Sequence, residues 1–322
     1  MELHLDTLLR ALSTKRMGGG LAGLEFGPEG IAVAKARPDS ASGPALNYAA
    51  FHAEPNTEKQ PQLLKQLVAE QGWRGAHCNV VLHPSQYQIT QIEAPDVPEH
   101  EWREALRWRL RDTFGASPDD LAFDIKSLPE NAYPGRNRMV LLVAMPRKAM
   151  EKIVNQITMT GLTLRSIDIT EHAMRNLSNY IPFQPSAPKA LLRMRNSGSM
   201  LTVTDNSCLY FSRAMDIGLE TIRREQDIAA GQLRALDTLA LEIQRSLDFF
   251  ESQCRRGRVG KLYLLPFKQP VAGLSDFLRE RLAVETGAYP VNTNLLPEGP
   301  WNEREIAYCL GAMGAALRRD NA

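Results

Sequence analysis

Residues 21–36 read Leu21-Ala-Gly-Leu-Glu-Phe-Gly-Pro-Glu-Gly-Ile-Ala-Val-Ala-Lys-Ala36, and this stretch gives the first indication of how the chain folds. Its two apolar segments are separated by the turn residues Gly27-Pro-Glu-Gly30, and a third apolar segment follows at 46–51. Short apolar segments with turn residues between them are typical of antiparallel strands. The stretch therefore predicts a three-stranded meander.

The same pattern returns beyond Pro182-Phe-Gln-Pro-Ser-Ala-Pro188, a proline-rich segment that predicts a stiff connector. Apolar segments again alternate with turns there, at 191–193, 200–204 and 208–212. Helices and strands follow each meander, and they are expected at 58–71 (helix), 78–82 (strand), 146–160 (helix) and 164–169 (strand), then at 235–254 (helix), 261–265 (strand), 273–282 (helix), 290–295 (strand) and 304–318 (helix). Two matching halves predict a duplicated α/β domain with a cleft between its lobes.

Residues 84–145 interrupt the first half. Strands expected at 87–92, 121–128 and 138–145, with a helix at 99–114, predict a small inserted α+β subdomain. The full division is an N-terminal helix and linker (1–20), the first lobe (21–83 and 146–181), the insertion (84–145), the connector (182–188), the second lobe (189–303) and a closing helix (304–322) that packs back on the first lobe.

Composition argues against several classes of protein. Among 322 residues, 38 Lys and Arg balance 37 Asp and Glu, so no general attraction to nucleic acid or an acidic membrane is expected. Cys78, Cys208, Cys254 and Cys309 follow no metal-ligand spacing, which predicts reduced thiols. The sequence shows no apolar run of about 18 residues and no signal peptide. We therefore expect a cytoplasmic protein that reaches a membrane only through a partner.

The N-terminal segment leaves three interpretations open. Leu5, Leu8, Leu9 and Leu12 recur at helical spacing ahead of Gly18-Gly-Gly20. They fit a helix docked on its own domain, a free amphipathic helix that binds a partner or a membrane surface, or a disordered lead.

Five segments together resemble one known family. They are, in chain order, Gly23-Leu-Glu-Phe-Gly27, Val143-Ala-Met-Pro146, Asp168-Ile-Thr-Glu171, Glu242-Ile-Gln-Arg-Ser-Leu-Asp-Phe-Phe250 and Leu310-Gly-Ala-Met-Gly-Ala-Ala-Leu317. In this order they resemble the PilM-type proteins of type IV pilus assembly, most closely the MshI branch of the mannose-sensitive haemagglutinin (MSHA) pilus. The resemblance covers nearly all of residues 21–318. It implies an α/β fold of the actin-like ATPase type (ribonuclease H-like, duplicated), with the inserted subdomain and a reduced fourth subdomain at 219–238.

The resemblance also implies a nucleotide cleft, built by two phosphate hairpins and a glycine-rich third turn. In the first hairpin, Glu25-Phe-Gly27 keeps a carboxylate, but Pro28 removes a backbone donor. In the second, Arg193-Met-Arg195 stands where the family has Asp-x-Gly, and Asn196-Ser-Gly198 follows. In the third, Pro266-Phe-Lys-Gln-Pro270 replaces a Gly-Gly pair.

These departures predict a degenerate cleft with no catalytic residue, no metal site and no cofactor. Its residues would be Glu25, Gly27, Arg193, Asn196, Ser197 and Gly198. Glu25 is then expected to be a solvated turn acid, and Arg193 and Arg195 to be exposed loop cations. Two alternatives stay open, namely ATP binding without turnover and an active ATPase whose Glu25 holds Mg²⁺.

The family resemblance implies a scaffold that binds the cytoplasmic N-terminal tail of an inner-membrane pilus assembly protein, and that binds no nucleic acid. The family holds an extended peptide between the insertion and the first lobe. We therefore expect a groove near 84–145, with Tyr87, Ile89 and Leu106 close to it. A cytoplasmic scaffold of type II secretion shares the fold but continues into a membrane span, which this chain is not expected to carry.

Overall fold

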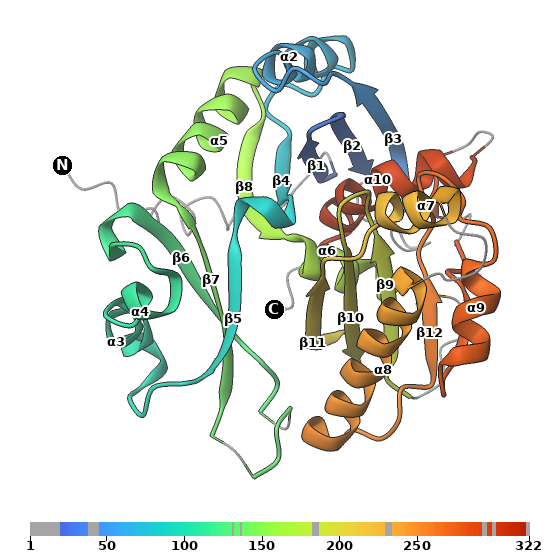
Figure 1. Ribbon diagram of the computed structural model, residues 1–322. Coiled ribbons are helices and arrows are strands. Elements are labelled where there is room, and N and C mark those ends of the chain that lie inside the picture. The colour runs from blue at the N-terminus through green and yellow to red at the C-terminus, as the bar shows by residue number, and fades with distance from the viewer. Residues whose placement is uncertain are drawn as a thin grey trace.

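Figure 1 shows two five-stranded sheets side by side, with a smaller three-stranded sheet next to the first. This computed structural model describes residues 20–37, 45–130, 132–135, 137–181, 187–228, 234–291, 295–297 and 301–319. The expected N-terminal helix and most of the expected connector at 182–188 lie outside these residues.

The first sheet has the strand order β3-β2-β1-β4-β8. Its strands are β1 (Ala22–Gly27), β2 (Gly30–Ala36), β3 (Leu46–Ala53), β4 (His77–Leu82) and β8 (Thr163–Ile169). The strands β1 to β3 are antiparallel, with Glu25 opposite Ala32, whereas β4 and β8 are parallel to β1. The predicted meander is confirmed.

The second sheet repeats this topology, in the order β11-β10-β9-β12-β13. Its strands are β9 (Lys189–Met194), β10 (Ser199–Asp205), β11 (Cys208–Met215), β12 (Lys261–Leu264) and β13 (Glu285–Ala288). Three antiparallel strands again precede two parallel ones. The predicted duplication is therefore confirmed.

One strand of the second sheet lies earlier in the chain than the sequence indicates. The last strand of this sheet is β13, which pairs with β12 through Glu285–Ala288, whereas residues 292–294 of the strand expected at 290–295 lie outside the described residues. Pro290 cannot donate a ladder hydrogen bond and follows the strand. Leu295 and Leu296 are buried in an apolar cluster to which both lobes contribute, and this burial accounts for their hydropathy.

Helices cover both sheets. The first lobe carries α2 (Gln60–Glu70), α5 (Arg147–Thr160), α6 (Thr170–Ser178) and α10 (Glu303–Ala316), and the second carries α7 (Leu219–Ile228), α8 (Arg234–Cys254) and α9 (Leu274–Arg281). The helix α10 packs on β1, β2, β3 and α6, and thus on the first lobe. The sequence analysis did not predict α6, because this helix is only nine residues long and several of its buried side chains, such as Glu171 and Asn176, are polar.

Glycines let α10 approach β1 closely. A Cβ on Gly23 of β1 would lie 2.0 Å from the Ala312 carbonyl oxygen, and one on Gly314 would lie 2.3 Å from the Ala173 carbonyl oxygen. Backbone contact at these distances leaves no room for any side chain. Residues 310–316 of α10 therefore pack directly on β1 and α6, and this contact positions the strand that carries Glu25.

The insertion forms the third sheet, with the order β5-β7-β6. Its strands are β5 (Gln88–Glu93), β6 (Leu121–Ser127) and β7 (Met139–Pro146), all antiparallel. The single helix expected at 99–114 is wrong, because it is split into α3 (Trp102–Arg107) and α4 (Leu110–Phe114). The Arg109 amide donates to the Leu106 carbonyl three residues earlier, which breaks the α-helical ladder between them.

The insertion also contacts the second lobe. Tyr133, Met139 and Leu141 belong to the same buried cluster as Leu209 and Cys254 of the second lobe. In Figure 1 the end of the β6–β7 hairpin accordingly lies near the C-terminal end of α8. The insertion therefore touches both lobes.

Candidate functional site

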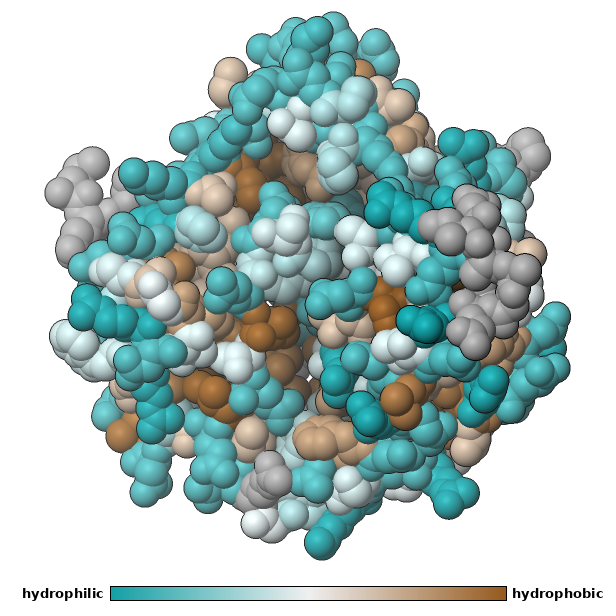
Figure 2. All heavy atoms as spheres, in the orientation of Figure 1, coloured by the Kyte–Doolittle hydropathy of each residue, from teal (hydrophilic) through white to brown (hydrophobic). Residues whose placement is uncertain are grey.

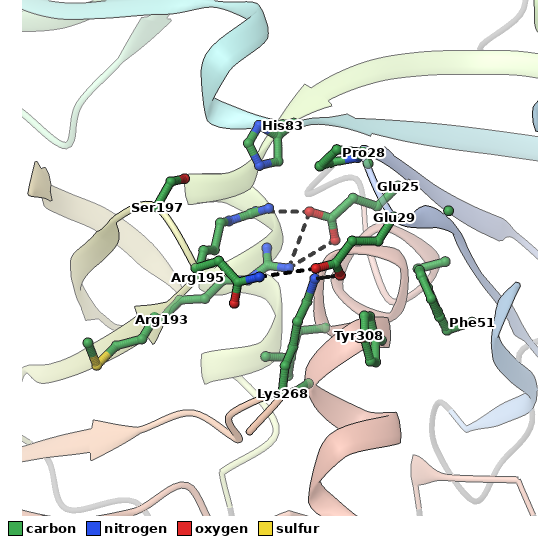
Figure 3. A pocket seen from close by; sticks show the side chains of 17 residues that line it. Glu25, Pro28, Glu29, Phe51, His83, Arg193, Arg195, Ser197, Lys268 and Tyr308 are labelled. Atoms are coloured by element: carbon green, nitrogen blue, oxygen red, sulfur yellow. Dashed lines mark hydrogen bonds and ion pairs between the residues drawn. The ribbon is translucent and has the colours of Figure 1, made fainter. Parts of the chain in front are cut away.

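Charged side chains from both lobes meet in the cleft (Figure 3). Glu25 comes from β1, whereas Arg193 comes from β9 and Arg195 follows that strand directly. The Arg193 Nη2 donates to Glu25 Oε1 and Oε2 at 3.2 and 3.0 Å. The Arg195 Nη2 donates to Glu25 Oε1 at 2.9 Å and to the Thr170 hydroxyl at 3.2 Å. One acid thus holds two arginines across the cleft.

The expected exposure of these three residues is wrong. The side chains of Glu25, Arg193 and Arg195 are only 6%, 5% and 17% exposed. Burying any one of these charges alone would cost several kcal/mol, but opposite charges with direct hydrogen bonds offset that cost. The sequence reasoning considered each hairpin separately, and it therefore missed that the acid of one hairpin pairs with the arginines of the other.

The ion pair stays charged at neutral pH. Burial alone would raise the pKa of Glu25, but Arg193 and Arg195 lower it to about 2. Burial and the charge of Arg195 lower the pKa of Arg193 to about 10, with Glu25 acting in the opposite direction. The carboxylate that could have held Mg²⁺ is thus occupied by two protein cations.

A second set of contacts closes the cleft beside the first. Glu29, in the β1–β2 turn, forms an ion pair with Lys268 and accepts a hydrogen bond from Asn196 Nδ2 at 3.1 Å. The Lys268 Nζ lies 4.3 Å from the centre of the Tyr308 ring, which stacks on Phe51 at 4.0 Å. The sequence reasoning missed Lys268 because it searched the third turn only for glycines, and it missed Glu29 because it considered only Glu25 as the acid of the first hairpin.

The space left in the cleft is small. Its volume is about 120 Å³, whereas pockets for drug-sized ligands measure about 300–1,000 Å³. Glu25, Gly27, Arg193, Asn196 and Ser197 all line it, so the structure brings five of the six expected cleft residues together. Gly198 instead packs behind the turn, where a Cβ would lie 2.9 Å from the Met215 carbonyl oxygen.

His83 lies at the edge of this cleft and is uncharged at neutral pH. Burial and the charges of Arg195 and Arg193 lower its pKa to about 4, although Glu25 acts in the opposite direction. The site therefore contains a neutral imidazole beside two permanent cations.

The acids of the Asp168–Glu171 segment are also engaged by protein groups. Asp168 accepts from the Arg318 Nη1 at 3.1 Å and lies 2.8 Å from the His172 Nδ1. Burial alone would raise the pKa of Asp168, but His172 and Arg318 hold it well below its usual range. Glu171 accepts a hydrogen bond from the Tyr87 hydroxyl, and burial raises the pKa of Glu171. Within the described residues, no three His, Cys, Asp or Glu side chains gather as a metal-ligand set.

The three residues expected near a peptide groove lie mostly inside the molecule. Tyr87 is buried against Glu171, and Leu106 is fully buried with Trp102 and Val140 beneath the inserted sheet. Ile89 is partly buried between two apolar clusters. The Leu106 side chain is thus inaccessible to a peptide, which corrects that expectation.

A different groove lies in the first lobe, at the point where the chain enters the insertion. It has a volume of about 380 Å³ and extends between α2, α5, the β1–β2 hairpin and the short 3₁₀ helix η1 (Pro84–Gln86). Phe26, Val80, Val81 and Ile153 supply its apolar lining. Figure 2 shows hydrophobic atoms in this hollow, between the elements that Figure 1 labels α2 and α5.

Comparison with known proteins shows the class of fold. The sequence matches no family model and no curated protein. A Bacteroides thetaiotaomicron protein with an actin-like ATPase fold and unknown function matches over 83% of this chain and 90% of its own, with 11% identity and a TM-score of 0.50. The chain thus has the actin-like ATPase fold, as expected.

Two further structures match over a larger share of this chain. A structure of the PilM–PilN type IV pilus biogenesis complex matches over 95% of this chain and 100% of its own, with 19% identity and a TM-score of 0.68. The cytoplasmic domain of EpsL, an inner-membrane component of the Vibrio cholerae type II secretion system, matches over 94% and 97%, with 13% identity and a TM-score of 0.51.

Proposed function

We propose that this chain is a scaffold of the type IV pilus machinery that binds the cytoplasmic N-terminal tail of an inner-membrane assembly protein. The observation that carries this proposal is the apolar groove between α2, α5 and η1. Support comes from the similarity to a PilM–PilN complex along nearly the whole chain. The groove also lies at the border of the first lobe and the insertion, where the family resemblance puts an extended peptide.

The chemistry of the groove suits an extended peptide with apolar side chains. Phe26 and Ala149, which are partly exposed, offer apolar contacts, while Gln86 and Gln156 at the same groove can hydrogen-bond to a peptide backbone. Lys152 at the rim is ion-paired with Glu58 at 2.7 Å, so the protein already neutralises that charge. We infer that side-chain burial, and not charge, determines which tail binds.

Tail binding is expected to depend on Ala149, which lines the groove and is partly exposed. Ala149→Trp fills the space, so it should weaken binding of the cognate tail peptide at least tenfold, whereas Ala149→Ser should bind within about twofold of wild type. Fluorescence anisotropy with labelled tail peptides measures both. Equal affinity of the tryptophan variant and the wild type would show that the peptide binds elsewhere.

We propose further that the protein is not an enzyme and needs no nucleotide. This proposal is supported by the Glu25 ion pair and the Glu29–Lys268 pair, which lie in the cleft where the family resemblance implies that phosphates and Mg²⁺ bind. Calorimetric titration with Mg²⁺-ATP is therefore expected to give no saturable heat up to about 1 mM. Binding in the micromolar range would refute this part of the proposal and favour the ATPase alternatives.

The proposal also covers the type of pilus and the place in the cell where this chain works. We infer from the residue resemblance that the partner belongs to an MSHA-type pilus and holds this chain at the cytoplasmic face of the inner membrane. Within the described residues, no helix is both long enough and apolar enough to cross a bilayer. Pull-downs with tails from MSHA-type, other type IV pilus and type II secretion proteins separate the candidates, and capture of only the secretion tail would favour the EpsL-like role.

A further inference from the structure

A third cavity lies where the insertion and both lobes meet. Its volume is about 210 Å³, and it shares no lining residue with the cleft or the groove. The insertion contributes Lys126, the helix α6 contributes His172 and Arg175, and the β10–β11 turn contributes Ser207 and Cys208. A group bound here would contact all three parts of the molecule.

The residues that line this cavity include basic side chains but no acidic side chain. Its charged or titratable lining consists of Lys126, His172, Arg175 and the thiol of Cys208, with no carboxylate. His172 is paired with Asp168, which lies 2.8 Å from its Nδ1. Arg175 and Lys126 therefore supply positive charge that no lining acid compensates.

The hydrogen bonds that position Arg175 go to a neutral group. Its Nε and Nη2 donate to the Asn176 amide oxygen at 3.2 and 2.8 Å. The Asn176 amide nitrogen donates in turn to the Gly314 carbonyl at 2.8 Å, so the amide oxygen is fixed toward the guanidinium. Arg193, by contrast, meets a carboxylate. Burial lowers the pKa of Arg175, and the nearby Asp168 carboxylate, which pairs with His172 and Arg318, offsets this effect only in part.

The buried acids next to these residues are already in use. Asp168 is engaged by His172 and Arg318, and Asp205, two residues before Ser207, accepts from the Arg256 Nε at 3.0 Å. Among the described residues the charge of Arg175 is therefore only partly compensated, and a bound anion would complete the compensation.

We propose that this cavity binds a compact oxyanion of the phosphate class, with Arg175 and Lys126 as its charged donors. The volume suffices for a phosphate group with a few waters, since each water takes about 30 Å³ in the liquid. Leu128, Leu141 and Leu209 line the rest of the cavity and reduce its water content, which strengthens charge-assisted hydrogen bonds. The bound anion would tie the insertion to both lobes. This site is separate from the tail-binding groove and does not depend on the proposed function.

Calorimetric titration of the full chain with sodium phosphate tests the proposal. Wild type is expected to bind one phosphate saturably, and Arg175→Gln should weaken binding at least tenfold. Lys126→Gln should weaken it severalfold and, because Lys126 is exposed, should fold normally even where Arg175→Gln does not. Hydrogen exchange should slow in 126–129 and 207–209 when phosphate is present.

Two controls locate the anion. Arg109→Gln removes one charge from an exposed helix turn and should leave phosphate affinity unchanged, as should Arg195→Gln in the cleft. A parallel titration with glycerol 3-phosphate identifies whether the natural group is free phosphate or a phosphate monoester, by which of the two binds more tightly. No saturable binding of either anion, or equal losses in the Arg109 or Arg195 variant, would overturn the proposal.

Discussion

Replacing Glu25 with glutamine is expected to lower the free energy of unfolding by about 3–5 kcal/mol at pH 7, because it leaves two buried arginines without their acid. Arg193 is only 5% exposed, so water cannot replace the lost carboxylate. Urea denaturation of both proteins measures the difference. Glu29→Gln is the matched control. Its side chain is 37% exposed, and its loss should cost about 1 kcal/mol or less.

The stability difference between wild type and Glu25→Gln is also expected to depend on pH. The pKa of Glu25 is about 2 in the folded protein against an ordinary value of 4.5, so the folded state favours the carboxylate. Its stabilising effect is therefore complete above pH 4.5 and is lost as the pH falls from 4.5 toward 2. The stability gap between wild type and Glu25→Gln should shrink over that window. A gap that is near zero at pH 7 would contradict the buried ion pair.

Alanine at Gly23 is expected to destabilise the protein by about 3 kcal/mol or more. The new Cβ would lie 2.0 Å from the Ala312 carbonyl oxygen and 2.5 Å from the Ala316 amide nitrogen. Both are backbone atoms of α10, so no side chain can rotate away and the helix must shift. Urea denaturation again measures the effect.

Gly27→Ala is the control for this prediction. A Cβ at Gly27 meets only the Gly30 carbonyl oxygen, at the ordinary distance of 3.7 Å, so the change should cost about 1 kcal/mol or less. A Gly23→Ala protein as stable as the Gly27→Ala protein would show that α10 does not pack on β1 at this distance.

The duplicated fold was predictable because its signals are local. Strand alternation and turn residues sit within short windows, as in 21–36, and both meanders were found from them. Errors arose where burial overrides the local pattern. Pro290 and the leucines after it suggested a strand, whereas the chain pairs earlier, at Glu285–Ala288. The helix α6 was missed because it is short and because it buries polar side chains such as Glu171 and Asn176, which hydropathy does not mark as buried.

The cleft residues were found, but their arrangement was not. Glu25 and Arg193 are 168 positions apart, and no window of sequence relates their charges. The replacement of an acid by arginine in one hairpin, with an acid kept in the other, was the available signal. The groove was not found, because its lining comes from β1, β4, η1 and α5 and has no common motif.

The contact between the β6–β7 hairpin and the second lobe has a mechanical consequence. Rocking the lobes apart would break the Glu25 and Glu29 ion pairs and also separate Tyr133 and Leu141 from the second lobe. Every 1.4 kcal/mol of that cost lowers the open population about tenfold. If a tail binds beside α5, a force applied through it would therefore pass from the first lobe to the second lobe, because these contacts resist a hinge motion between the lobes.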